Sequence, residues 1–192
     1  MNNLTEVVKQ LIIINAIIFL GTSLPMLVSL KPYFILFPPS TPYFKPIQLV
    51  THMFMHGDMG HLFFNMLALY FFGPMIERLW GPKKFLIYYL LCGLGAMVLH
   101  LLIGGGAPVL GASGAISGVV LAFAMLFPNA QVMLLIPPIP MKAKHMVLLF
   151  LGIDLFLGLS SYNTGIAHFA HLGGALFGFL LIMFWRKFPF GM

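Results

Sequence analysis

Charged residues are scarce in this 192-residue chain, because only 7% of its residues are Asp, Glu, Lys or Arg whereas 60% are hydrophobic. Its mean hydropathy of +1.01 excludes an ordinary water-soluble domain. Cysteine occurs once, at Cys92, which excludes a disulfide within the chain and suits a small packing residue. The ten basic residues form no patch interleaved with aromatic side chains, which argues against a nucleic-acid partner. These shortages indicate an integral membrane protein whose partner is the lipid bilayer.

Six apolar stretches reach, or nearly reach, the about 20 residues that a helix needs to cross a bilayer. We therefore predict an all-α integral membrane protein, a bundle of six transmembrane helices forming a single domain over residues 1–192. A long loop at residues 31–60 carries five prolines and several aromatic residues, which predicts a structured segment at the membrane interface. The six predicted spans are residues 10–29, 62–79, 84–103, 113–128, 143–160 and 166–185.

Basic residues divide unequally between the two ends of such a bundle. With both termini on one side, only Lys31 and Lys45 lie on the opposite side. By the positive-inside rule the termini are then cytoplasmic, and we expect a multi-pass protein of a bacterial cell membrane. The eight basic residues on the terminal side are Lys9, Arg78, Lys83, Lys84, Lys142, Lys144, Arg186 and Lys187.

Four polar residues share one depth near the outer end of this predicted bundle. His61 and Asn65 open the second span, Ser113 opens the fourth, and His171 follows the start of the sixth. His61 and Asn65 are separated by four positions, so both project from one face of their helix. Polar groups inside spanning segments are costly and are therefore candidates for function.

Glycine spacing predicts that two of these helices approach closely. Gly174 and Gly178 follow His171 at three and seven positions, so all three lie on one helical face. Gly114 and Gly118 form a matching small-residue track behind Ser113. This arrangement predicts that Ser113 meets His171.

A serine beside a histidine at a helix N-terminus suits nucleophilic catalysis. A histidine within hydrogen-bond reach accepts the proton of the hydroxyl, and the helix N-terminus favours a developing anion. His61 and Asn65 add donors of the kind that stabilise a tetrahedral oxyanion. Each residue taken alone is also explained by helix packing or by hydrogen bonds between helices.

Together the motifs resemble those of the rhomboid intramembrane serine proteases. The resemblance rests on "GASG" at 111–114, "HLFFN" at 61–65, "AHLGGALFG" at 170–178 and "FGPMIERLWG" at 72–81, in the family's order. It implies proteolysis of transmembrane protein substrates near the outer membrane face, through an acyl-enzyme and without a cofactor or metal.

The resemblance also implies a role for each site residue. Ser113 would be the nucleophile and His171 the general base and acid, while His61, Asn65 and the Ser113 backbone amide would form the oxyanion hole. His171 is preferred to His168 because the family's glycines follow it at the expected spacing. The residues implied to support the site are Gly111, Gly114, His168, Gly174 and Gly178.

Several further polar residues lie in or near the predicted spans, and two other functions are possible for the chain. Asp154 is the only acidic residue well inside a predicted span, since Glu77 lies at the end of its own span, and we expect Asp154 to form structural hydrogen bonds. His52, His56, Asp58 and His61 are close enough in sequence to suggest a metal enzyme, but no H-E-x-x-H motif is present, and anchoring of the loop is the simpler role. A non-catalytic rhomboid-like protein or a transporter is the other alternative. Substrate identity and oligomeric state are not predicted.

Overall fold

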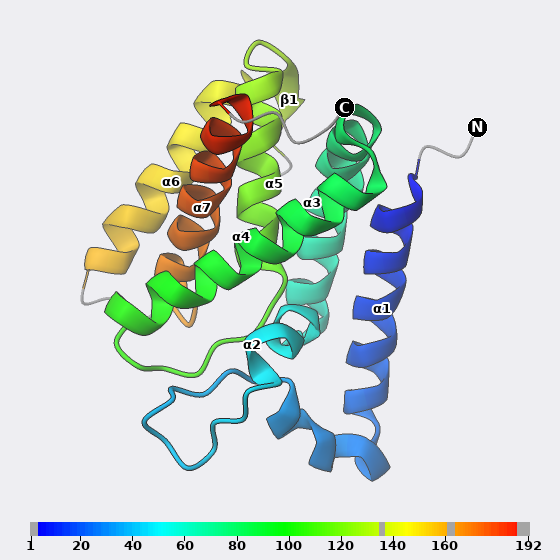
Figure 1. The fold of residues 1–192 in the computed structure, drawn as a ribbon, viewed down its shortest axis with the longest axis vertical. Helices are drawn as coiled ribbons and strands as arrows, with labels where there is room; N and C mark the ends of the chain where they lie inside the picture. The colour runs from blue at the N-terminus through cyan, green and yellow to red at the C-terminus, as the bar shows by residue number, and fades with distance from the viewer. Residues whose placement is uncertain (1–3, 135–136, 161–163, 188–192) are drawn as a thin grey trace.

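The computed structural model describes residues 4–134, 137–160 and 164–187 and is mainly helical (Figure 1). Four helices are long and apolar enough to cross a membrane: α1 (Glu6–Ser23), α3 (Met59–Trp80), α4 (Pro82–Ile103) and α7 (His168–Lys187). The shorter helices are α5 (Ser113–Leu126), α6 (Ala143–Leu159) and α2 (Gln48–Thr51), with 3₁₀ helices η1 (Pro25–Tyr33) and η2 (His52–Phe54) and a hairpin of β1 (Gln131–Met133) and β2 (Pro140–Lys142).

The first predicted span is the one that differs most from the observed helix. Residues 10–29 were expected to form it, but α1 ends at Ser23 and a 3₁₀ helix begins at Pro25. Leu24 precedes that proline and is extended, with ψ 134°. A residue before proline is disfavoured in the helical region, so the sequence itself ends α1 there.

Helix α5 occupies the middle of the bundle, in contact with α3, α4, α6 and α7. Its small residues make this central position possible, because helices approach closely where side chains are small. Figure 1 shows α4 crossing in front of α5, with α6 and α7 on one side and α1 beyond α3 on the other. The buried residues of α5 are Gly114, Ala115, Ile116, Gly118, Val119, Ala122, Phe123 and Ala124.

The backbones of α5 and α7 touch through glycine. A Cβ atom added at Gly174 would overlap the backbone carbonyl of Gly114, and one added at Gly178 would lie 3.1 Å from the Cα of Gly118. Substitution by any larger residue would therefore push the two helices apart. These contacts, at about the second and third turns of α7, hold that part of the helix against the first half of α5.

Helix α6 is held far less extensively than α5. It buries only Ala143, Met146 and Val147, all in its first two turns. Its exposed side chains are largely apolar, as are many on the outside of α1, α3 and α7, which suits contact with lipid. Large exposed apolar residues include Ile17, Leu20, Phe63, Phe71, Leu148, Phe156, Phe179 and Met183.

A buried glutamine organises the long connection between α1 and α3. The Gln48 side-chain amide donates to the carbonyls of Pro32, at 2.8 Å, and Tyr43, at 2.9 Å. Its oxygen accepts from the backbone of Lys45 at 3.0 Å. One side chain thus forms hydrogen bonds with backbone groups that are not paired in a helix or a sheet. Because these groups have partners, an irregular segment can be buried.

The same connection is bonded to the segment that precedes α5. Leu36 and Val109 exchange two backbone hydrogen bonds of 2.9 Å, and the Gly111 amide donates to the His52 carbonyl at 2.9 Å. Both segments lie at the end of the bundle where α5 and α7 begin (Figure 1). The loop therefore fixes the backbone that leads into Ser113.

At the opposite end of the bundle, a carboxylate of α3 caps α1. Glu77 is buried and accepts hydrogen bonds from the backbone amides of Val7, at 3.0 Å, and Val8, at 2.9 Å, and from the Thr5 hydroxyl. These amides belong to the first turn, which has no acceptor within its own helix. A negative charge there also complements the helix dipole.

We expect Glu77→Gln to lower the free energy of unfolding by about 1–3 kcal/mol, because a buried acceptor bonded to two amides and a hydroxyl loses its charge. Thermal unfolding of the detergent-solubilised protein measures the loss. The matched control is Glu6→Gln, since Glu6 is exposed and its partners among the described residues are Lys9 and Gln10 on the same helix. An equal shift in both variants would contradict the capping role.

Candidate active site

Ser113 and His171 form a direct hydrogen bond across the α5–α7 contact. Ser113 is the first residue of α5, and His171 lies one turn into α7. The distance between the serine Oγ and the histidine Nε2 is 2.9 Å. A hydroxyl at this distance from a ring nitrogen can transfer its proton to it as it attacks an electrophile.

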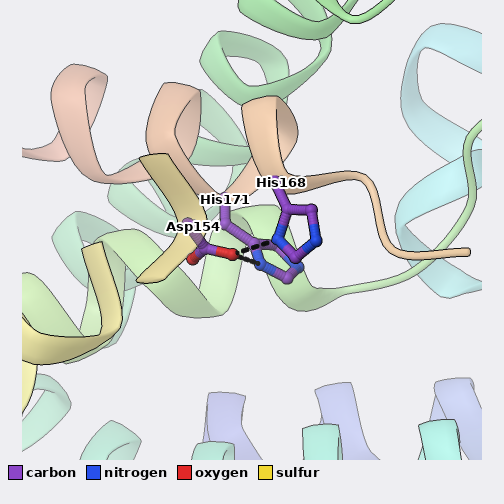
Figure 2. A group of neighbouring side chains, drawn as sticks. All are labelled: Asp154, His168 and His171. Carbon is purple, nitrogen blue, oxygen red and sulfur yellow. Dashed lines mark hydrogen bonds and ion pairs between the residues drawn. The ribbon is translucent and has the colours of Figure 1, made fainter. Parts of the chain in front are cut away.

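One oxygen of Asp154 accepts from two histidines of α7. The Asp154 Oδ1 lies 2.7 Å from the Nδ1 of His168 and 3.1 Å from the Nδ1 of His171. Figure 2 shows both rings directed toward this one carboxylate, which comes from α6. An ionised carboxylate can only accept, so each Nδ1 carries a proton. Neutral His171 is therefore left with an unprotonated Nε2, the state that accepts from Ser113.

Thr164 completes this network on the side away from Ser113. Its hydroxyl lies 2.7 Å from the Nε2 of His168 and accepts from the backbone amide of Ile166 at 3.1 Å. The Nδ1–H of His168 donates a hydrogen bond to Asp154, so the Nε2 of the neutral ring carries no proton. This Nε2 therefore accepts a hydrogen bond, and the Thr164 hydroxyl donates it. The donor and the acceptor of each hydrogen bond between Thr164 and Ser113 are thus assigned without conflict.

Gly111 leaves the space that the His61 ring occupies beside Ser113. Its φ of 122° is one that residues with a side chain rarely adopt. A Cβ atom there would lie 2.8 Å from the Nε2 of His61 and 3.6 Å from the Oγ of Ser113. Glycine is therefore required both by the backbone conformation and by the approach of the His61 ring.

A cavity of about 710 Å³ joins the four polar residues that the sequence placed at one depth. His61 and Asn65 reach it from α3, Ser113 from α5 and His171 from α7. The Asn65 amide donates to the His61 carbonyl at 2.9 Å. The other residues of the wall are Gly57, Asp58, Phe64, Pro108, Val109, Leu110, Thr164, Gly165, Ile166 and Ala167.

The supporting residues take two different positions. Gly114, Gly174 and Gly178 lie in the α5–α7 contact behind the cavity, while His168 bonds to Asp154 and has no hydrogen bond to Ser113 among the contacts found. Asp154 forms the hydrogen bonds expected of it, and its partners are the two histidines of α7, which the sequence did not identify. The signal for a paired group was an acidic residue well inside a predicted span, where an unpaired charge is costly.

Of the two histidines expected to anchor the long connection by hydrogen bonds, only His52 does so among the described residues, because both ring nitrogens of His56 are buried without a partner. His52 Nδ1 donates to the Gln48 carbonyl at 2.7 Å, and the His56 ring packs edge-on against that of His61, with 4.9 Å between centroids. Burial lowers the pKa of His52 and that of His56 from 6.5 to about 4, so both rings are neutral at pH 7. In the part of the chain that the structure describes, the cluster of possible metal ligands is a different one, Asp154 with His168 and His171.

Comparisons with known proteins agree on one family. A family model described as "Rhomboid domain" matches residues 43–188. RHOMBOID-like protein 12, mitochondrial, of Arabidopsis thaliana is 37% identical over 145 residues, which is 66% of this chain and 43% of the relative. Rhomboid protein 1, mitochondrial, of Saccharomyces cerevisiae is 31% identical over 143 residues, 70% of this chain and 40% of the relative.

A mammalian relative matches almost the whole chain. Presenilin-associated rhomboid-like protein, mitochondrial, of Mus musculus is 30% identical over 186 residues, 92% of this chain and 48% of the relative. The chain thus spans less than half the length of these three relatives.

We expect the stability of the protein to fall as the pH drops from about 6.5 to about 4. Between these values the unfolded chain binds protons at His52 and His56 that the folded chain does not, so acid favours unfolding. The midpoint of thermal unfolding, measured across this range, should fall less steeply in His56→Leu. The exposed His145 supplies the control, because His145→Leu should keep the wild-type slope. A His56→Leu variant with that same slope would contradict a buried, neutral His56.

Proposed function

This chain belongs to the rhomboid family, and from that premise we propose that it is an intramembrane serine endopeptidase acting on transmembrane protein substrates. The 2.9 Å contact between the Ser113 hydroxyl and the His171 ring, in the wall of a cavity of about 710 Å³, is the observation that carries the proposal. The position of this contact, at the start of α5 and α7, supports cleavage near the outer membrane face.

Ser113 acts as the nucleophile and His171 as the base. As the serine Oγ attacks the scissile carbonyl carbon, its proton moves to the Nε2 of His171, which then gives it to the leaving amine. Water attacks the resulting acyl-enzyme, with His171 again accepting and returning the proton. Asp154 holds the other ring nitrogen, which keeps Nε2 unprotonated before attack and stabilises the charged ring afterwards.

The oxyanion formed in this attack needs donors on the opposite side of the carbonyl. The Ser113 backbone amide lies in the first turn of α5, where amides have no acceptor in the helix. His61 faces the serine across Gly111, and the Asn65 amide keeps a second hydrogen besides the one given to His61. These three groups supply the stabilisation that the resemblance implies.

Residues 1–192 act as one membrane domain of six spans, α1, α3, α4, α5, α6 and α7, with the α1–α3 connection at the outer interface. Trp80, Trp185 and Lys84 gather at the other end of the bundle, with 5.6 Å between the tryptophan rings and 4.7 Å from the Lys84 Nζ to the Trp185 ring. Such side chains favour the headgroup region, so this end lies at an interface, and the excess of Lys and Arg there supports a cytoplasm-like side.

The compartment is a separate question from the sidedness. The Arabidopsis, yeast and mouse relatives carry the word mitochondrial in their names, which conflicts with the bacterial cell membrane expected from the sequence. We therefore propose a multi-pass protein with the site at the outer side of its membrane and assign no organelle.

Labelling by a serine-reactive fluorophosphonate tests the pair directly. Purified wild-type protein should be labelled, whereas Ser113→Ala and His171→Ala should lose labelling, and His168→Ala should keep it at a reduced rate. Loss in His168→Ala with retention in His171→Ala would reverse the assignment of the base. A folded wild type that stays unlabelled would favour the non-catalytic rhomboid-like alternative.

Asp154→Asn tests the orienting role. An asparagine amide can donate to Nδ1 and so favour the opposite tautomer of His171, as the corresponding change does in other serine proteases. We expect the maximal rate constant of labelling to fall by about a hundredfold or more, while the probe concentration giving half that rate changes little. Asp154→Glu, which keeps an acceptor, should recover part of the rate. Equal rates in wild type and Asp154→Asn would remove Asp154 from the mechanism.

A further inference from the structure

The cluster of Asp154, His168 and His171 has the composition of a metal site. A carboxylate and two imidazoles are ligands that zinc and similar divalent ions prefer. The three candidate ligand atoms lie within 4.8 Å of one another, on two helices that the fold already brings together. In Figure 2 dashed lines join one ring nitrogen of each histidine to the same oxygen of Asp154.

The two distances from Asp154 to the histidines are close to those between ligands of one ion. Zinc binds nitrogen and oxygen ligands at about 2.0–2.2 Å, so two ligand atoms of the same ion lie about 3 Å apart. Asp154 Oδ1 lies 2.7 Å from one Nδ1 and 3.1 Å from the other. Because both Nδ1 atoms point at this oxygen, the Asp154 carboxylate must shift aside for one ion to lie between the three ligand atoms.

Two cavities give an ion and its waters access to the cluster. His171 lines the cavity of about 710 Å³ that contains Ser113. His168 lines a second cavity of about 370 Å³, bounded also by His100 and Leu157. Residues 164–167 form part of the wall of both cavities, so each of the two histidines, though not Asp154, borders a space from which water can reach it.

We propose that Asp154, His168 and His171 form an inhibitory site for a divalent transition-metal ion of the zinc class. The inhibition rests on the function proposed above. A metal on Nδ1 of neutral His171 leaves its proton on Nε2, because a ring nitrogen that binds a metal cannot carry a proton. Nε2 then donates to Ser113 and no longer accepts from it, so the base is disabled while the protein stays folded.

His168 can change tautomer in the same step. With the metal on its Nδ1, the His168 proton moves to Nε2 and is donated to the Thr164 hydroxyl, which is 2.7 Å away and can accept as well as donate. Each neutral ring keeps one proton, so binding needs no net proton release. The threonine thus tolerates both the metal-free and the metal-bound states of the network.

Binding can be measured without catalysis in Ser113→Ala. Isothermal titration with Zn²⁺, and the visible absorption of Co²⁺ as a probe of coordination, should show one site in this variant. Adding His168→Asn should weaken binding by about tenfold or more, since one ligand is lost. The control His145→Asn changes an exposed histidine at the other end of α6 and should leave binding unchanged. Equal affinity with and without His168 would overturn the site.

Inhibition is then measured on the wild type. Zn²⁺ at concentrations that saturate Ser113→Ala should slow fluorophosphonate labelling by about tenfold or more, and EDTA should restore it. Binding without slowed labelling would overturn the inhibitory role. If the wild type were not labelled under any condition, the proposed protease function would fail, while the titrations of Ser113→Ala would still decide whether the metal binds.

Discussion

The contact between the backbones of α5 and α7 is the constraint on which the rest of the site depends. Lipid supplies no hydrophobic force between apolar helices, so they associate through close packing and hydrogen bonds. Gly174 against the Gly114 carbonyl brings the helix axes as near as backbones allow. Only at that separation does a short side chain such as Ser113 reach a ring on the neighbouring helix.

Polar groups at the site are linked so that few are left to the apolar surroundings. The network runs from Thr164 through His168 and Asp154 to His171 and Ser113, and each hydroxyl or ring nitrogen in it has a partner. The loop contributes in the same way, because the Gly111 amide donates to His52. Buried polar groups without partners cost several kcal/mol in hydrocarbon, which accounts for the completeness of this network.

Hydropathy alone predicted most helices to within a few residues, because a chain in lipid must pair its backbone groups internally. The end of α1 was missed because the apolar run continues past Ser23, and Pro25 decides where the helix stops. The glycine spacing predicted that the helices carrying Ser113 and His171 pack closely against each other. The sequence drew attention to Asp154 but could not identify its partners. Which helix Asp154 faces depends on the rotation of α6 about its axis, and that rotation is set by packing against other helices. The same holds for Glu77, whose partners lie about 70 residues earlier in α1.

The carboxylate of the network stands on the least securely held of the helices around α5. Helix α6 buries residues only in its first two turns, whereas Asp154 lies in its fourth, beyond them. Ser113 and His171 belong instead to two helices locked together by glycine. A displacement of the far half of α6 would therefore leave Ser113 and His171 in contact but release the Nδ1 of His171. The position of α6 thus determines which ring nitrogen of His171 carries its proton.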